Sequence, residues 1–222
     1  MKTVIITGTT SGLGRSLLNS LLSEDVSILA INRRPGTKLE NSHSSAKLTM
    51  MTCDLSKLTL EDVVFPPSTF EGVSEVVFVM NAATIQPLKP AAAIPSADLQ
   101  MAFNVNFFSY VTLTRILLEK CRDRNLPLRI IFISTGSINR AISGWSAYSA
   151  SKGALLSFCK HVALENSNVK FEVFEPGIFK SNIQDQISVF NAGSSKIQIA
   201  SDFTDISEIS NRLRTIILLD SQ

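Results

Sequence analysis

The stretch Thr7-Gly8-Thr9-Thr10-Ser11-Gly12-Leu13-Gly14 follows a short apolar segment, residues 4–6, and runs into an amphipathic segment, residues 13–22. This order predicts a β-strand, a tight turn and an α-helix. Glycine lets the backbone turn sharply, and its missing Cβ allows a ligand to approach closely. The first amides of a helix are unpaired and carry a partial positive charge, so the stretch indicates a phosphate-binding loop. A tight turn without a ligand is the alternative interpretation.

Short apolar runs recur along the chain and are separated by helical patterns. Several runs are apolar throughout, as expected for parallel strands that are covered on both faces. Strands that alternate with helices imply right-handed crossovers and a Rossmann-type, doubly wound α/β sheet with strand order 3-2-1-4-5-6. We expect strands at 4–6, 26–31, 48–52, 76–80, 130–133 and 169–174, and helices at 13–22, 58–64, 98–125, 146–166 and 205–219.

The composition predicts one globular domain over residues 1–222, because 45% of the residues are hydrophobic and 18% are charged. The net charge is +2 and no basic run exceeds Arg33-Arg34, so neither a nucleic acid nor a membrane surface is an expected partner. Cys53, Cys121 and Cys159 are odd in number and far apart, which argues against a disulfide framework and a metal site. They favour a reducing, cytoplasmic setting. The residues before Thr7 are too few for a signal peptide or a membrane span.

Tyr148 and Lys152 lie four residues apart in Tyr148-Ser149-Ala150-Ser151-Lys152, within an expected helix. Residues at this spacing share a helix face, so the ammonium would favour the ionised phenol and lower the pKa of Tyr148 from its ordinary value near about 10. Such a tyrosine can transfer a proton near neutral pH. Alone, the pair more often means a solvated lysine beside a half-buried ring. The glycine loop favours the catalytic interpretation.

The second expected strand ends in Asn32-Arg33-Arg34, about twenty residues after the glycine loop, where a dinucleotide fold meets the adenosine ribose. An acidic residue there would bind the 2′-hydroxyl of NAD and repel a 2′-phosphate. This chain instead has two guanidinium groups, which pair well with phosphate. The sequence therefore predicts NADP rather than NAD, and solvated surface arginines are the alternative.

Taken together, these residues resemble the short-chain dehydrogenase/reductase family over nearly the whole chain. Further motifs occur in the family's order: Cys53-Asp54-Leu55, Met80-Asn81-Ala82-Ala83, Asn104-Val105-Asn106, Ile133-Ser134-Thr135 and Pro176-Gly177. The stretch Gly144-Trp145-Ser146-Ala147-Tyr148 is similar to the sepiapterin reductase and benzil reductase branch. The resemblance implies NADPH-dependent reduction of a small, rather apolar ketone, aldehyde or dicarbonyl.

The resemblance also implies roles for individual residues. Tyr148 would protonate the carbonyl oxygen, and Lys152 would tune the tyrosine and bind the nicotinamide ribose. Asn106 would bend its helix and hold a water that connects Lys152 to solvent, and Thr135 would orient the carbonyl. The residues expected to bind the cofactor are Gly8, Thr10, Ser11, Gly12, Leu13, Gly14, Asn32, Arg33, Arg34, Asp54, Leu55, Asn81, Ala82, Ala83, Tyr148, Lys152, Pro176, Gly177, Ile178 and Ser181.

The chain departs from the family pattern at Thr135, where the family has its catalytic serine, and Ser134 stands beside it. Threonine keeps the hydroxyl and adds a methyl group, so we predict Thr135 as the orienting residue, with Ser134 as the alternative. The family's usual seventh strand is missing after the expected helix 205–219. A homodimer through helices 98–125 and 146–166 needs nothing from that segment and is therefore expected.

Residues 181–201 are rich in Ser, Gln and Asn and follow the last strand, at the edge where open α/β sheets bind ligands. They are a candidate substrate lid, and a mobile surface loop is an equal alternative. Trp145, Phe179 and Phe190 are candidates for the pocket wall, although isolated aromatic residues are more often core. A regulatory NADP-binding protein without turnover is the second functional hypothesis. A P-loop nucleotide-binding protein is excluded because no Gly-Lys-Ser/Thr follows the glycines.

Overall fold

The computed structural model describes residues 1–35, 45–59, 63–179 and 203–219. The described strands are parallel and form one six-stranded sheet in the order β3-β2-β1-β4-β5-β6, which confirms the predicted doubly wound α/β topology. The strands are β1 Lys2–Thr7, β2 Val26–Asn32, β3 Lys47–Thr52, β4 Glu75–Met80, β5 Leu128–Ile133 and β6 Val169–Phe174.

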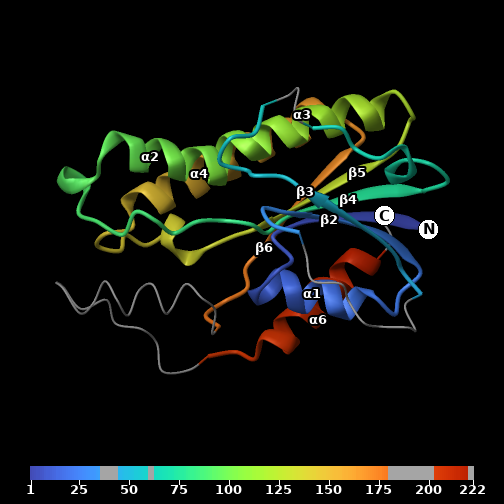
Figure 1. Ribbon diagram of the computed structural model, residues 1–222, viewed down its shortest axis with the longest axis horizontal. Coiled ribbons are helices and arrows are strands. Elements are labelled where there is room, and N and C mark those ends of the chain that lie inside the picture. Colours follow the sequence, from blue (N-terminus) through green and yellow to red (C-terminus); the bar gives the residue numbers. More distant parts are fainter. Residues whose placement is uncertain (36–44, 60–62, 180–202, 220–222) are drawn as a thin grey trace.

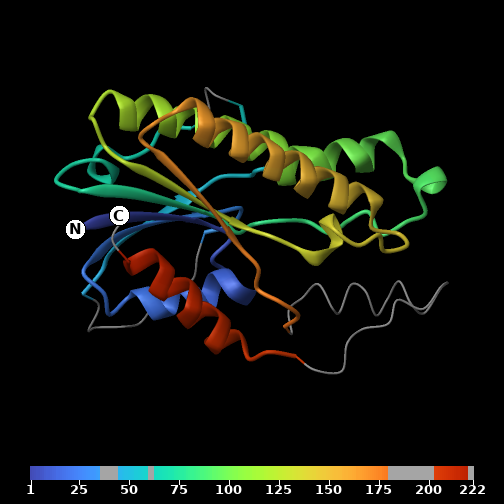
Figure 2. The ribbon, with the colours of Figure 1, turned by 180° about the vertical axis from the view of Figure 1, so that it is seen from behind.

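Two layers of helices enclose this sheet (Figures 1 and 2). Helices α1 (Gly12–Leu21) and α6 (Ile206–Leu218) lie side by side on one face. On the other face, α2 (Ser96–Phe103), a π-helical turn η3 (Asn104–Phe108) and α3 (Ser109–Arg122) form one continuous rod beside α4 (Ser146–Glu165). Short 3₁₀ turns are η1 Pro67–Thr69, η2 Ala91–Ala93 and η4 Gly136–Ile138.

The helix expected at 58–64 is wrong for the residues that the structure describes. Leu58, Thr59, Val63 and Val64 have no helical conformation, and residues 60–62 lie outside the described part of the chain. Two prolines follow at positions 66 and 67, and a proline pushes the residue before it out of the α region. A short apolar stretch cannot overcome this restriction, and the chain forms the 3₁₀ turn η1 instead.

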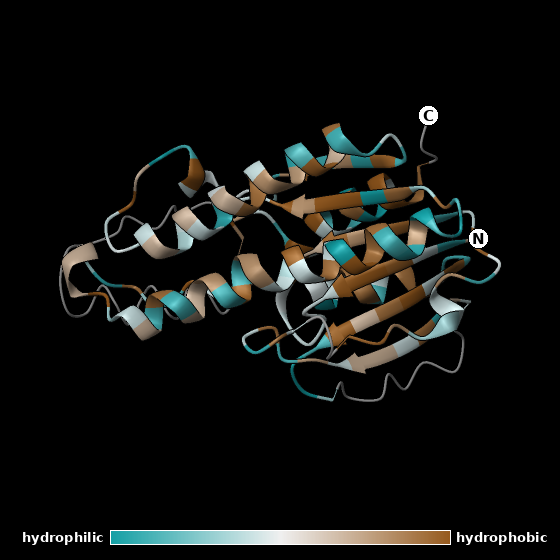
Figure 3. Cartoon of the chain, turned by 90° about the horizontal axis from the view of Figure 1, so that it is seen from above, coloured by the Kyte–Doolittle hydropathy of each residue, from teal (hydrophilic) through white to brown (hydrophobic). Residues whose placement is uncertain are grey.

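Strand residues alternate between two separate apolar cores, one on each face of the sheet. Ile5 and Phe132 pack with the helices α3 and α4, whereas Val4, Ile6 and Ile131 pack with α1 and α6. Both faces of the central strands β1, β2, β4 and β5 are covered, so these strands are mostly apolar and buried. The edge strands β3 and β6 carry exposed polar residues such as Lys47 and Lys170. Figure 3 shows the strands largely brown between helices that carry both colours.

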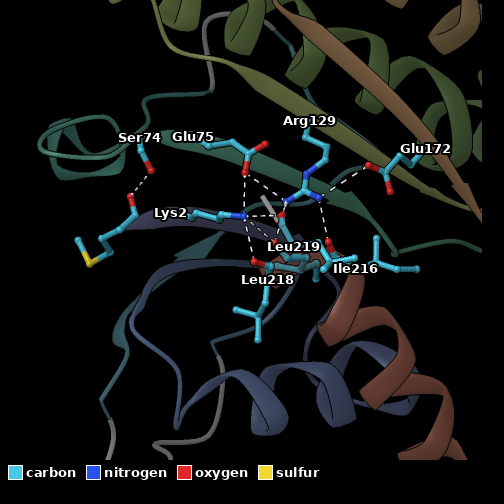
Figure 4. A network of polar contacts seen from close by, with 10 residues as sticks. Lys2, Ser74, Glu75, Arg129, Glu172, Ile216, Leu218 and Leu219 are labelled. Carbon is cyan, nitrogen blue, oxygen red and sulfur yellow. Dashed lines mark hydrogen bonds and ion pairs between the residues drawn. The ribbon is translucent and has the colours of Figure 1, made fainter. Parts of the chain in front are cut away.

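A buried ionic cluster lies at the amino ends of the strands and holds the C-terminus of α6 (Figure 4). The Arg129 guanidinium is 3.2 Å from a Glu75 carboxylate oxygen and donates a hydrogen bond of 2.7 Å to the carbonyl of Ile217. Lys2 pairs with Glu75 at 3.3 Å and donates to the carbonyl of Leu219 at 2.6 Å. Two cations therefore satisfy carbonyls at the negative end of the helix dipole and tie α6 to β1, β4 and β5.

Candidate active site

The glycine loop connects β1 to α1 at the carboxyl edge of the sheet. Gly8 and Gly12 have φ angles of +72° and +56°, in the left-handed region that favours glycine. A Cβ at Gly14 would overlap the carbonyl oxygen of Gly8, so this glycine allows the helix to pack on the turn. A Cβ at Gly12 would meet nothing within 4 Å. Among the described residues, the space beside Gly12 is therefore open, and the loop can accommodate the pyrophosphate of a dinucleotide.

Thr7 and Tyr110 form a polar node behind this loop that the sequence interpretation missed. The Thr7 hydroxyl accepts hydrogen bonds from the backbone amides of Asn81 and Ala82, at 3.1 and 3.0 Å. The Tyr110 hydroxyl donates to the Ala82 carbonyl at 2.6 Å and lies 2.8 Å from the Thr7 hydroxyl. The side-chain amide of Asn81 donates to the backbone carbonyls of Thr7 and Gly8, at 2.9 and 3.0 Å. This node joins the ends of β1 and β4.

The residues after β2 divide into one buried amide and two exposed cations. Asn32 accepts a hydrogen bond of 2.7 Å from the Thr9 backbone amide and donates one of 2.9 Å to the Thr9 hydroxyl. Its side chain thus holds the glycine loop. Arg33 and Arg34 are exposed beyond it. These guanidinium groups are the parts of the predicted phosphate site that face solvent.

Asp54 lies just after β3, on the same edge of the sheet. The Ser56 backbone amide and hydroxyl donate to its carboxylate at 3.0 and 2.8 Å. These hydrogen bonds lower the pKa of Asp54, and the Arg33 charge lowers it further. A cavity of about 250 Å³ opens here between Thr52, Cys53, Asp54, Lys57 and Leu58. Asp54 and Arg33 are therefore brought together beside a hollow, as expected for the adenosine end of a dinucleotide.

The structure corrects the expected electrostatics of Tyr148 and Lys152. Burial raises the pKa of Tyr148, and a hydrogen bond with the Thr135 side chain offsets part of this effect. Burial lowers the pKa of Lys152 to about 7. The prediction that Lys152 lowers the pKa of Tyr148 is wrong for this structure, because both groups are removed from water and the lysine Nζ lies over the Phe132 ring, 4.3 Å from its centroid.

Asn106 lies in the π-helical turn between α2 and α3, where the expected distortion of the helix is present. Its side chain is fully buried and accepts a hydrogen bond of 2.8 Å from the Thr84 amide. The Asn106 amide donates to the Thr84 carbonyl at 2.8 Å and to the Ser151 hydroxyl at 3.0 Å. Ser151 in turn donates to the Tyr148 carbonyl at 2.8 Å. Asn106 is thereby connected to the backbone of Tyr148.

The two hydroxyls after β5 differ in direction, because neighbouring residues of an extended segment face opposite sides. Ser134 is buried, and its amide continues the sheet through a hydrogen bond of 2.8 Å to the Phe174 carbonyl. Thr135 begins the turn η4, where its hydroxyl accepts from the Ser137 amide at 3.3 Å. Because the Thr135 side chain also lowers the pKa of Tyr148, whereas Ser134 does not contribute to it, Thr135 is the better candidate for the hydroxyl beside the proton donor.

An apolar wall adjoins Tyr148. Ile85 and Leu88 pack with the tyrosine in a small separate cluster, and Trp145 lies against it edge to face, with ring centroids 5.7 Å apart. Phe179 instead packs with the core beneath α1 and α6. Phe190 lies outside the described residues. Of the three aromatic residues expected in the pocket, the structure places Trp145 beside the tyrosine.

The remaining cofactor candidates occupy the same edge of the sheet. Leu13 and Leu55 are buried in the two cores, so each can offer a ligand only its backbone. Pro176 is buried after β6, and Gly177 has a φ angle of +75°. The exposed residues here are Thr10, Ser11, Ala83, Gly177 and Ile178. Ser181 and the candidate lid, residues 181–201, lie outside the described residues.

The model of the short chain dehydrogenase family matches residues 2–192. The chain belongs to this family. Its members are oxidoreductases that act on CH–OH and C=O groups. The fold and the cluster of candidate residues at the carboxyl edge of the sheet are consistent with this activity. Among the described residues, no group of three His, Cys, Asp or Glu side chains is arranged to hold a metal ion. None of the described helices is both long and apolar enough to cross a membrane.

This short chain dehydrogenase is similar to several known proteins. It is 30% identical over 203 residues to benzil reductase ((S)-benzoin forming) from Bacillus cereus, which covers 84% of this chain and 79% of the relative. It is 24% identical over 169 residues to carbonyl reductase (NADPH) 2 from Sus scrofa, covering 76% and 67%. A solved short-chain dehydrogenase/reductase from Burkholderia vietnamiensis superposes with a TM-score of 0.68 at 26% identity, covering 92% of this chain and 98% of the other.

Proposed function

We propose that this short chain dehydrogenase is an NADPH-dependent reductase of a small ketone, aldehyde or dicarbonyl. One arrangement carries the proposal: the Tyr148 phenol is close enough to the Thr135 side chain for Thr135 to lower its pKa, and it lies against an apolar wall that includes Trp145. A polar carbonyl oxygen and an apolar substituent would both find partners there. The names of the Bacillus cereus and Sus scrofa relatives support carbonyl reduction.

The preference for NADPH rests on the residues after β2. The side chain of Asn32 is already hydrogen-bonded to Thr9, and the segment Asn32-Arg33-Arg34 contains no acidic residue. The exposed guanidinium groups of Arg33 and Arg34 can each form charge-assisted hydrogen bonds to a 2′-phosphate. The name of the Sus scrofa relative includes NADPH and supports this choice.

The bound nicotinamide cofactor would supply hydride to the carbonyl carbon. Tyr148 donates its hydroxyl proton to the carbonyl oxygen as negative charge grows there. The raised pKa of Tyr148 keeps this proton in place at neutral pH, as reduction requires. The Thr135 hydroxyl orients the same oxygen. Lys152 binds the nicotinamide ribose, and Asn106 together with Ser151 holds the backbone of the tyrosine.

The test is NADPH oxidation with a panel of diketones, quinones, aldehydes and pterins. We expect turnover by the wild type and a loss of roughly 10²–10⁴-fold in Tyr148→Phe, with unchanged NADPH affinity, because only the proton donor is removed. If both proteins bind NADPH equally and neither turns over any carbonyl, the protein is a regulatory NADP-binding protein instead.

We further propose a homodimer that forms through the helices around 98–125 and 146–166. The outer face of this layer carries the exposed apolar residues Leu99, Met101 and Phe108, with exposed fractions of 40%, 49% and 47%. A second copy would remove this surface from water. Sedimentation velocity should give a dimer for the wild type and a monomer for Phe108→Asp. A monomeric wild type at micromolar concentration would contradict the proposal.

The proposed setting is the reducing cytoplasm. Cys53, Cys121 and Cys159 are buried and form no disulfide with one another, so the fold uses them as small apolar side chains. Fractionation of the source cells with an antibody to the chain should recover it in the cytosolic fraction. Recovery from an oxidising compartment would contradict this assignment.

A further inference from the structure

Lys152 packs on an aromatic ring at the base of the candidate site. Its Nζ lies 4.3 Å from the ring centroid of Phe132, on β5. Lys152 is 2% exposed and Phe132 is 0% exposed, so water does not separate or screen the two groups. The ring belongs to the same core as Leu155 and Cys159 of α4. The contact therefore joins the helix that carries Tyr148 to strand β5 of the sheet.

The surroundings of Lys152 offer little other compensation for a buried ammonium. On its own helix, the Cys159 thiol is the nearby titratable group, and burial raises its pKa to about 12, so it stays neutral. Tyr148 on the same helix is also neutral because burial raises its pKa, and burial raises the pKa of the Tyr110 phenol of α3 as well. Strand β5 contributes Phe132, which does not titrate. Among the described residues, no carboxylate contributes to the pKa of Lys152.

We propose that Phe132 is a positioning residue for Lys152, whose ammonium is held by the negative face of the ring. An aromatic face attracts a cation through its quadrupole, and this attraction grows when the pair is removed from water. The ring leaves the other N–H groups of the ammonium free to donate hydrogen bonds, whereas a carboxylate would compete for them directly. The role of Lys152 in turnover rests on the proposed function, but its contact with Phe132 does not.

Phe132 also offsets part of the effect of burial on the pKa of Lys152. Burial alone lowers the pKa of Lys152 toward loss of the proton near neutral pH. A cation on a desolvated ring gains free energy that corresponds to about one pH unit in a titration. Phe132 thus keeps a larger fraction of Lys152 charged at neutral pH and holds its Nζ in one place.

The experiment is an NMR titration of the free protein containing ¹³C,¹⁵N-labelled lysine, with the Lys152 signal assigned by its loss in Lys152→Arg. We expect Phe132→Leu to move the midpoint of the Lys152 titration downward by about one pH unit. Phe78→Leu is the matched control, because Phe78 is a fully buried phenylalanine of the same core on the next strand. It should leave the Lys152 midpoint unchanged. An unchanged midpoint in Phe132→Leu would overturn the proposal.

A second variant keeps the shape of the core. Site-specific replacement of Phe132 by 4-fluorophenylalanine weakens the negative face of the ring with almost no change in volume, so it should shift the midpoint in the same direction by less. No shift here would overturn the proposal even if Phe132→Leu fails to fold. A protein that reduces no carbonyl, yet shows both shifts, would remove the proposed function and leave this contact standing.

The turnover readout is separate. If the proposed function holds, the alkaline limb of the kcat/KM profile, which reports groups of the free enzyme, should move to lower pH in Phe132→Leu together with the Lys152 midpoint. Loss of activity without a moved limb would mean that the ring only fills space, and would also overturn the proposal.

Discussion

The amide nitrogen of Asn106 donates a hydrogen bond of 3.0 Å to the hydroxyl of Ser151, across the interface between the π-helical turn η3 and helix α4. Ser151 passes the connection on to the Tyr148 carbonyl. Through Ser151, Asn106 therefore holds the backbone of the candidate proton donor, Tyr148. Asn106 and Ser151 are 45 positions apart in the chain. This connection makes Ser151, which is fully buried, a candidate positioning residue for Tyr148.

Ser151→Ala should lower both stability and kcat. It leaves one Asn106 N–H buried without an acceptor, which costs about 1–3 kcal/mol in the free energy of unfolding. A slightly misplaced Tyr148 should reduce kcat by roughly tenfold. Urea unfolding and steady-state kinetics measure the two effects. The control is Ser157→Ala, an exposed serine on the same helix, which should change neither quantity. Equal effects in the two variants would contradict this role.

Thr135→Ala should reduce kcat by roughly 10²-fold, because the carbonyl loses a hydrogen bond that orients it and stabilises its growing charge. Thr135→Ser should keep most of the activity, since it keeps the hydroxyl. Ser134→Ala is the comparison that separates the two candidate hydroxyls. A larger loss in Ser134→Ala than in Thr135→Ala would move the assignment to Ser134.

Arg33→Ser should weaken NADPH binding by roughly 10–100-fold, because the variant loses a charge-assisted hydrogen bond to the 2′-phosphate. NADH binding should be unchanged, since NADH has no 2′-phosphate. Arg34→Ser measures how much the second guanidinium contributes to NADPH affinity. Calorimetric titration with both cofactors measures the affinities. Arg122→Ser makes the same charge change at the end of α3, away from the loop, and should change neither affinity. Tighter binding of NADH than NADPH by the wild type would contradict the cofactor assignment.

Lys152→Met should stabilise the fold, and more at low pH than at high pH. Burial lowers the pKa of Lys152 from 10.5 to about 7, so the unfolded chain binds more protons between these values. Stability contributed by this group therefore rises with pH across that window and is lowest below about pH 7. At about 1.4 kcal/mol per pH unit, the difference amounts to roughly 5 kcal/mol.

Urea unfolding of Lys152→Met and wild type at pH 6 and above pH 10.5 measures this difference. The variant should be the more stable protein at pH 6, and the two should converge at the higher pH. An equal difference in the free energy of unfolding between variant and wild type at both pH values would show that the lysine is uncharged, or exposed, in the folded protein.

Arg129→Leu should destabilise the fold by about 3–5 kcal/mol, because Glu75 then remains buried with less compensation and α6 loses donors to its last carbonyls. The control is Arg122→Leu, whose ion pair with Asp123 is exposed and should contribute at most about 1 kcal/mol. Thermal or urea unfolding of the two variants gives the comparison. Similar losses in both would show that burial does not set the strength of the Arg129 cluster.

Local sequence patterns predicted the elements that carry the site. Strand positions, the long helices and the glycine turn follow from apolar periodicity and from residues that tolerate positive φ. The helix expected at 58–64 is wrong because prolines at 66 and 67 outweigh a short apolar pattern. The pKa of Tyr148 was predicted in the wrong direction, because spacing places Lys152 on the same helix face but does not show how deeply both groups are buried.

The sequence by itself determined the doubly wound sheet, the glycine turn after β1 and the spacing of Tyr148 and Lys152. These features depend on neighbours within one or two turns of the chain. Only the tertiary structure decided that Asn106 meets Ser151, that Phe132 lies beneath Lys152 and that Arg129 caps α6. Such contacts join residues distant in the chain, and burial sets their strength, so they exist only once the layers of the fold are packed.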